Sequence, residues 1–221
     1  MIPPNKSAAF VWRMEEVLDL YEEPYDPLFP VVCFDERPCQ LLAEVREPRP
    51  MAPGRSERRD HEYERKGTAN VLMAFEPLAG WRRASVTERR RGREFAEEVR
   101  RLAEEDYPKA EKIRLVCDNL STHTASAFYE TFPPEQARRL ARKVKFVYTP
   151  VHGSWLNMVE VELSVLVRQC LKRRLPDTET LRREAWAWEA ERNRLGVSVD
   201  WRFTTNDARA KLRKLYPSIE H

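Results

Sequence analysis

The sequence lacks the features that would send it into or across a membrane. No run approaches the roughly 18 consecutive apolar residues of a bilayer-spanning helix. The N-terminus, MIPPNKSAAF, has neither the basic start nor the apolar stretch of a signal peptide. We therefore expect a cytoplasmic protein with no membrane partner. Its 221 residues, 42% hydrophobic and 10% aromatic, are enough to bury a sizeable core.

Cysteine and net charge are also scarce. The four cysteines show no C-x-x-C spacing, which argues against a zinc site and against a disulfide framework. The net charge is only +3, so overall charge does not indicate a nucleic-acid partner. Phosphate contacts would have to come from local basic groups at 55–59, 89–93 and 168–174. Within these groups the DNA-binding candidates are Arg89, Arg90, Arg91, Lys172, Arg173 and Arg174, each with a solvated surface role as the alternative.

The spacing of apolar residues predicts strands alternating with helices. Strands are expected at 31–36, 68–77, 81–87, 112–119 and 144–150, and helices at 7–22, 93–105, 124–131, 134–143, 156–171 and 178–194. The polar, proline-containing stretch 44–66 reads as a long surface excursion. Gly80 falls in a hairpin turn. This order predicts an α/β fold, a mixed sheet with an antiparallel three-strand half plus parallel strands, flanked by helices.

Two acids stand at the carboxyl ends of apolar strands. Asp35 closes VVCFDE, and Asp118 follows KIRLVC. A charge beside a core is costly unless it is paired or coordinates a metal. A third acid, Glu160, on a following helix would complete an all-oxygen site for two Mg²⁺ or Mn²⁺ ions. Glu162 lies about 200° around the same helix, so it cannot share that site. The alternative is that these acids cap helices or pair with arginines.

Longer motifs decide between the two readings. They are VVCFDE at 31–36, TERR at 87–90, DNLSTHT at 118–124 and TPVHGSWLNMVEVELSVLVRQCL at 149–171. Together they resemble DDE transposases of the mariner-like superfamily, and most closely the bacterial insertion sequence 630 family. The resemblance implies an RNase H-like catalytic domain at 31–195, preceded by a helix and linker at 1–30. A tail at 196–221 would pack on that domain or extend it.

The resemblance also implies an activity. Asp35, Asp118 and Glu160 become the catalytic and metal-binding residues of a DNA-cleaving and strand-transferring enzyme. Such an enzyme excises an element at its inverted terminal repeats and joins the 3′ ends to a TA target. Its partners would be double-stranded DNA and a second copy of the chain, as a homodimer on that DNA.

Supporting roles come with alternatives. Asn119 could bind a phosphate or a metal-bound water, or form an Asx turn. His123 and His152 could contact DNA or relay a proton, or make only local hydrogen bonds. Asn157 could orient Glu160 or cap its helix. Trp155 could stack on a flipped or terminal base, or anchor the core.

One departure from the family is the early position of Asp35. It leaves no room for the helix-turn-helix modules that such transposases carry, so recognition of the terminal repeats would need an upstream helix-turn-helix polypeptide. A truncated chain, a split reading frame and a decayed copy would each explain this. The main alternative function is a non-catalytic remnant or regulator that pairs with a full-length transposase. A stand-alone RNase H-like nuclease is a further alternative, disfavoured by the HGSWLN-x-x-E segment.

Overall fold

The computed structural model describes residues 7–46, 54 and 62–218. Its centre is a five-stranded sheet in the order β3-β2-β1-β4-β5. Strand β1 pairs antiparallel with β2 and β2 antiparallel with β3, whereas β4 runs parallel to both β1 and β5. The predicted mixed sheet is therefore confirmed. The strands are β1 (Val31–Glu44), β2 (Tyr63–Glu76), β3 (Trp81–Thr87), β4 (Ile113–Cys117) and β5 (Val144–Tyr148).

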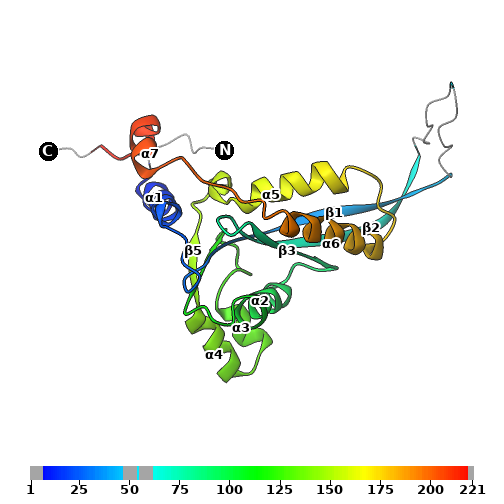
Figure 1. Cartoon of the computed structure of the whole chain (residues 1–221), viewed down its shortest axis with the longest axis horizontal. Coiled ribbons are helices and arrows are strands. Elements are labelled where there is room, and N and C mark those ends of the chain that lie inside the picture. The colour runs from blue at the N-terminus through cyan, green and yellow to red at the C-terminus, as the bar shows by residue number, and fades with distance from the viewer. Residues whose placement is uncertain (1–6, 47–53, 55–61, 219–221) are drawn as a thin grey trace.

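Helices cover both faces of the sheet (Figure 1). On one side lie α2 (Gly92–Arg101), α3 (Ser126–Thr131) and α4 (Pro134–Lys143). On the other side lie α5 (Val159–Leu166) and α6 (Thr178–Arg194). Beyond β5, α1 (Ala8–Glu22) lies beside α7 (Thr205–Lys211). Single π-helical turns, Leu102–Asp106 and Val167–Leu171, continue α2 and α5, and short 3-10 turns cover Ser154–Leu156 and Arg213–Leu215.

The sheet separates two apolar layers, because successive side chains of a strand point to opposite faces. Cys33 of β1 belongs to the layer shared with α1, α5 and α6. Its neighbours Val32 and Phe34 belong to the layer shared with α2, α3 and α4. The same alternation sends Asp35 to the α5 side and Glu36 to the α2 side.

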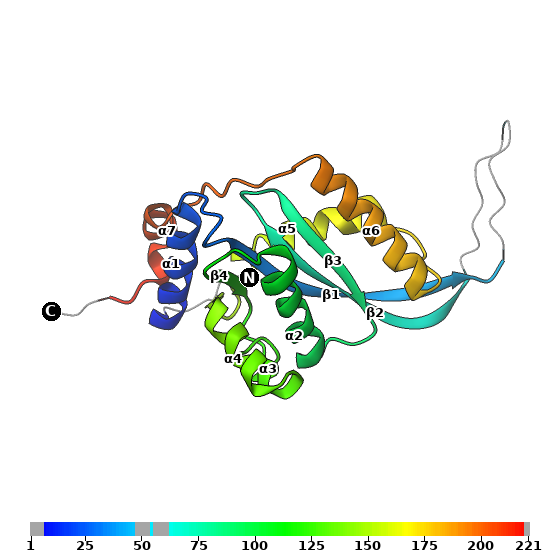
Figure 2. The same ribbon diagram turned by 60° about the horizontal axis from the view of Figure 1, so that its bottom comes forward.

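The first two strands are longer than the predicted strands at 31–36 and 68–77, and β2 takes up the last part of the expected surface excursion at 44–66. Strand β1 continues to Glu44 and β2 begins at Tyr63, so the two strands form a long hairpin arm with Glu44 opposite Tyr63. Polar side chains do not end these strands, because pairing uses only backbone groups and the first six residues of β2, 63–68, are exposed. Figure 2 shows the arm extending away from the helices. The basic group at 55–59 lies outside the described residues.

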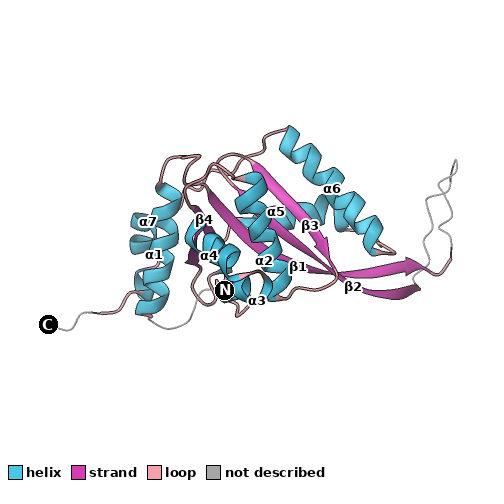
Figure 3. Ribbon diagram, turned by 90° about the horizontal axis from the view of Figure 1, so that it is seen from below, coloured by secondary structure: helices cyan, strands magenta, loops and turns pink. Residues whose placement is uncertain are grey.

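Helix α6 covers the free edge of β3 (Figure 3). The backbone N–H of Ala84 donates to Glu189 Oε2 at 2.6 Å. Asn193 accepts from the N–H of Arg82 at 2.9 Å and donates to its carbonyl at 2.7 Å. Side chains thus replace the missing neighbouring strand and leave less of the edge open to another chain.

The turn before β3 also approaches the end of α6. Gly80 has a φ of 64°, and a Cβ there would lie 2.7 Å from the carbonyl oxygen of Gly196. Both the backbone conformation and the close approach therefore require glycine at the predicted hairpin turn.

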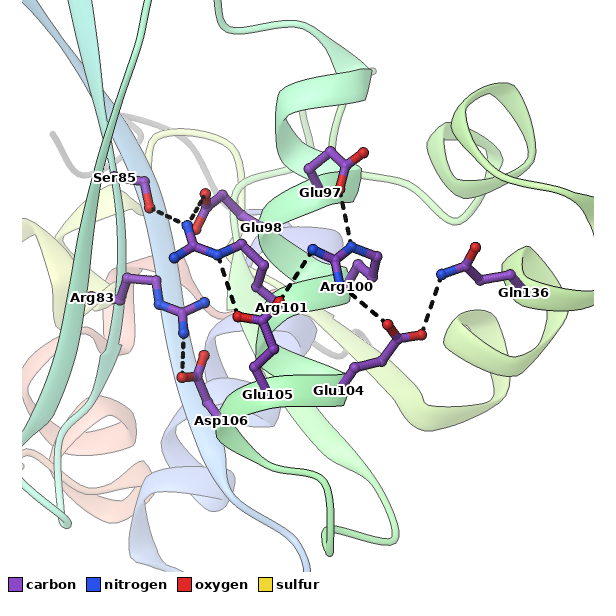
Figure 4. A network of polar contacts seen from close by, with 10 residues as sticks. All are labelled: Arg83, Ser85, Glu97, Glu98, Arg100, Arg101, Glu104, Glu105, Asp106 and Gln136. Atoms are coloured by element: carbon purple, nitrogen blue, oxygen red, sulfur yellow. Dashed lines mark hydrogen bonds and ion pairs between the residues drawn. The ribbon is translucent and has the colours of Figure 1, made fainter.

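A network of charged side chains ties β3 to α2 and its π-helical turn (Figure 4). Arg101 contacts both Ser85 Oγ and Glu98 Oε1 at 3.0 Å. Arg100 pairs with Glu97 at 3.0 Å and with Glu104 at 3.3 Å. These arginines are neutralised within the protein, so they add little free positive charge to the surface.

The C-terminal segment contains α7, a helix that the sequence analysis did not predict. It packs on α1, where Thr205 donates to Asp19 at 2.6 Å and Arg209 pairs with Glu15 at 2.8 Å. The division into 1–30, 31–195 and 196–221 stays a prediction. Within the described part of the chain, every helix is too short or too polar to cross a bilayer.

Candidate active site

The sequence predicts Asp35 at the end of a strand, but in the structure it lies inside β1. The parallel pairing of β1 with β4 covers only Val31 to Cys33, whereas the antiparallel pairing with β2 runs on and places Asp35 opposite Met73. Asp35 therefore sits just past the point where β1 loses its β4 neighbour. One side of it is open, although the strand itself continues.

Asp118 and Glu160 come from two other elements. Asp118 directly follows Cys117, the last residue of β4, where the N–H of Thr149 still donates to the Cys117 carbonyl at 3.0 Å. Glu160 lies in the first turn of α5. A carboxylate there is favoured by the partial positive charge of a helix N-terminus.

The three acids line one cavity of about 410 Å³. Thr149, Ser154 and Asn157 also line it. The sheet and α5 thus bring together side chains that are 83 and 42 positions apart along the chain. Glu162 does not line this cavity, as its position on the helix predicted. It is buried and paired with Arg82 at 2.8 Å and with Arg192 at 2.6 Å.

The carboxylates in the cavity disfavour one another's charge. Burial raises the pKa of Asp35 to about 7, opposed by a hydrogen bond from the Glu36 N–H and reinforced by the negative charges of Glu160, Glu36 and Asp118. No ion pair joins Asp35 or Glu160 to a basic side chain in the described part of the protein. A bound cation would relieve this repulsion.

His123 joins the cavity to the opposite face of the sheet. Its Nδ1 lies 2.6 Å from Asp118 Oδ1, and its Nε2 lies 3.1 Å from Glu36 Oε2. Burial lowers the pKa of His123, but the hydrogen bonds and charges of the two acids outweigh it and raise the pKa to about 9. The imidazolium therefore fixes the position of Asp118. Glu36, quoted within the VVCFDE motif but not selected as a site residue, could have been found from strand alternation.

A divalent metal suits the donor set, three carboxylates around a polar cavity, because hard cations prefer oxygen ligands. The described residues contain no group of three or more His, Cys, Asp or Glu side chains arranged to hold an ion as they stand. The carboxylates share the cavity without closing on one point, and one oxygen of Asp118 is engaged by His123. The chemistry of the donors fits a metal, and closing the site requires side-chain rotation.

Asn157 connects the two elements that carry Asp35 and Glu160. Its side-chain amide donates to the carbonyl of Phe34 at 2.9 Å, and its Oδ1 accepts from the N–H of Val159 at 3.4 Å. The residue is buried, with 2% of its surface exposed. Both predicted alternatives, capping α5 and positioning its first turn, are thus compatible with where Asn157 lies.

The remaining candidates do not line the cavity. Asn119 is exposed. His152 is exposed too, and lies in the turn closed by the hydrogen bond from Gly153 N–H to the Pro150 carbonyl at 2.8 Å. Its φ of 64° is unfavourable for a residue with a side chain. Trp155 packs against the rings of Trp201 and Phe203, at centroid distances of 6.4 and 6.0 Å, which is the core position given as its alternative.

The basic candidates divide between two places. Arg90 and Arg91 line a small hollow with Glu36 and His123, and Arg89 precedes them in the same exposed segment. Lys172 and Arg173 line a separate cavity of about 470 Å³ between the end of α5 and α6. There Arg173 pairs with Glu184, whereas Arg174 pairs with Glu44 of the hairpin arm. The first group lies beside the carboxylate cavity and the second lies apart from it.

A mixed five-stranded sheet in the order β3-β2-β1-β4-β5, with helices on both faces, is the RNase H-like class of fold. The sequence profile of the DDE superfamily endonucleases matches residues 30–182, and the chain belongs to that superfamily. No curated protein matches the sequence.

Solved structures with the same fold are complexes of the Mos1 mariner transposase. Its paired-end complex with the left transposon end aligns with a TM-score of 0.57 and 15% identity, covering 89% of this chain and 60% of that one. The paired-end complex with Mn aligns with a TM-score of 0.56 and 15% identity, covering 89% of this chain and 61% of that one. The paired-end complex with Mg aligns with a TM-score of 0.54 and 13% identity, covering 99% of this chain and 66% of that one. This chain therefore spans about 60% of the length of the first two Mos1 chains.

Proposed function

We propose that this chain is the catalytic domain of a cut-and-paste transposase that cleaves DNA strands and transfers them. Asp35, Asp118 and Glu160 hold two Mg²⁺ or Mn²⁺ ions. The main support is that these three acids line one cavity in a member of the DDE endonuclease superfamily. The structures of Mos1 with DNA ends, with Mn and with Mg are consistent with the same class of reaction.

The chain's own residues prepare the site for an incoming phosphodiester. When bound, the divalent ions would activate the attacking oxygen and stabilise the leaving one. His123 holds Asp118 in place, and Asn157 ties the first turn of α5 to β1 so that Glu160 faces Asp35. Arg90 and Arg91 contact the DNA backbone; the support is that they line a hollow together with Glu36 and His123.

The partners follow from this assignment. The substrates are double-stranded element ends with inverted repeats and a target containing TA. Two copies of the chain act together on the DNA, as a homodimer. An upstream helix-turn-helix polypeptide supplies recognition of the terminal repeats.

The test is a nicking and strand-transfer assay on DNA that carries the matching element ends, with Mg²⁺, with Mn²⁺ and with EDTA. We expect activity only with a metal. Asp118→Ala should reduce the rate by at least a thousandfold, because the barrier is lowered mainly by positioning and charge. Glu179→Ala, an exposed position on α6, is the matched control and should retain full activity.

Two outcomes would overturn the assignment. Unchanged activity of Asp118→Ala would reject the site. A folded wild-type chain that neither nicks nor transfers DNA in either metal, but lowers excision by an intact relative when co-expressed, would favour the regulator instead.

A further inference from the structure

The N-terminal half of α1 exposes an aromatic ring beside an arginine. Trp12 is 61% exposed although it is a large apolar residue. The Cζ of Arg13 lies 5.2 Å from the centroid of the Trp12 ring and 5.6 Å from that of Tyr148 on β5. We call Trp12, Arg13 and Tyr148 the α1 ledge. Nothing in the assigned catalytic machinery uses it.

Arg13 keeps its charge available for a ligand. No carboxylate pairs with it anywhere in residues 7–46, 54 and 62–218. Several arginines of the fold, such as Arg101 and Arg192, are neutralised by glutamates. A guanidinium held against aromatic rings still has its in-plane N–H donors free, and these suit a phosphate.

The α1 ledge is connected to the carboxylate cavity by a short chain of contacts. The Tyr148 hydroxyl donates to the backbone carbonyl of His123 at 2.9 Å. His123 in turn contacts Asp118 at 2.6 Å. The residue after Tyr148, Thr149, lines the cavity itself. Tyr148 therefore joins the α1 ledge to the residue that contacts Asp118, and its neighbour Thr149 joins the ledge to the wall of the cavity.

Resting on the proposed function, we propose that the α1 ledge binds an unpaired nucleotide of the DNA strand held at the active site. The base stacks on Trp12 and its phosphate binds Arg13. Stacking on an exposed tryptophan tolerates any base, because every base offers an aromatic face. A paired base inside a duplex offers no such face, so the ligand is an unpaired or frayed nucleotide.

The test is the equilibrium binding of fluorescently labelled DNA in EDTA, where no strand is cut. One probe is a blunt duplex, and the other is the same duplex with a single-stranded 3′ extension. We expect wild-type protein to prefer the extended probe about tenfold. Trp12→Ala and Arg13→Ala should each remove most of that preference, and Arg13→Lys should keep part of it.

Trp186→Ala is the matched control. Trp186 is 66% exposed, like Trp12, but it lies on α6, far from α1 in the fold (Figure 1). The preference for the extended probe should survive this substitution. Thermal unfolding of every variant would show that the fold is retained, as expected for the exposed Trp12 and Trp186 and the half-buried Arg13.

The outcomes separate this proposal from the proposed function. The proposed role of the α1 ledge is rejected if wild-type protein shows no preference for the extended probe. It is also rejected if Trp12→Ala and Arg13→Ala bind both probes as wild type does, or if they weaken binding to both probes equally. Failure of the metal-dependent nicking assay, with the probe preference intact, would reject the proposed function and keep the ledge.

Discussion

Two groups of charged residues on or near α5 differ in whether their acids have basic partners. On one face of the helix, Glu162 is fully buried and pairs with two arginines, Arg82 and Arg192. Around its first turn, Glu160 meets Asp35 and Asp118, and none of the arginines or lysines that the structure describes pairs with it. In the first group, which we call the balanced group, the protein itself supplies the positive partners of the acid. The second leaves a surplus of negative charge, which is what a cation site requires.

The largest effect should come from removing the acid of the balanced group. Glu162→Ala leaves the buried Arg82 without its partner, and we expect a loss of roughly 3–5 kcal/mol in the free energy of unfolding. Urea denaturation measures it. Glu179→Ala, which breaks only the exposed pair with Arg182, should change stability by about 0.5 kcal/mol or less. Equal losses in the two variants would contradict the contrast between the groups.

In the unbalanced group, removing a charge should stabilise the fold. The pKa of Asp35 in the folded state, about 7, lies above its ordinary value of 3.8. The folded chain therefore binds more protons between these pH values, and its stability falls as pH rises through this window. Asp35→Asn, which stays neutral, should raise stability by on the order of 2 kcal/mol above pH 7, after allowance for solvent screening, and by nothing at pH 3.

Urea denaturation of wild type and Asp35→Asn at pH 3 and pH 8 makes that comparison. A gain of the same size at both pH values would show that charge is not its cause. Added Mg²⁺ should stabilise wild type at pH 8, because the ion supplies the positive partner that the carboxylates lack. The stability of Asp35→Asn should change little, because this variant lacks one of the carboxylates that bind the ion.

The smallest expected effect concerns the turn beside the cavity. His152 holds a φ of 64°, which favours glycine. His152→Gly should therefore gain about 0.5–1 kcal/mol of stability, whereas His152→Ala, which keeps a Cβ, should gain nothing. Thermal unfolding distinguishes the two variants. If His152 contacts DNA, one of the alternatives that the sequence leaves open, the more stable glycine variant will also cut DNA more slowly than wild type.

Several elements could be predicted from local pattern alone. The apolar run before Asp118 gave β4, and the helical spacing after Ser7 and after Asp177 gave α1 and α6. The hairpin arm could not, because its polar residues such as Arg65 resemble a loop until backbone pairing with Leu42 is seen. Helix α7 was missed because its seven residues carry little apolar periodicity.

The residues of the site also divide into those that the sequence predicts and those that it does not. Asp35, Asp118 and Glu160 were selected from strand ends and from motif resemblance, and the structure places all three around one cavity. The partner of Asp118 was not foreseen. His123 is a sequence candidate, but strand alternation shows only that Glu36 lies on the face opposite Asp35. That His123 contacts Glu36 depends on the packed fold.

By itself, the sequence determined most of the strands and helices and the choice of the three acids, because apolar periodicity and short motifs are local properties. The tertiary structure alone decided which charges became partners. Glu162 pairs with arginines on β3 and α6, and His123 bridges Asp118 to Glu36 of β1, whereas Asp35 and Glu160 face each other. Charge pairing depends on distances across the fold, and those distances exist only after the sheet and its helices have packed.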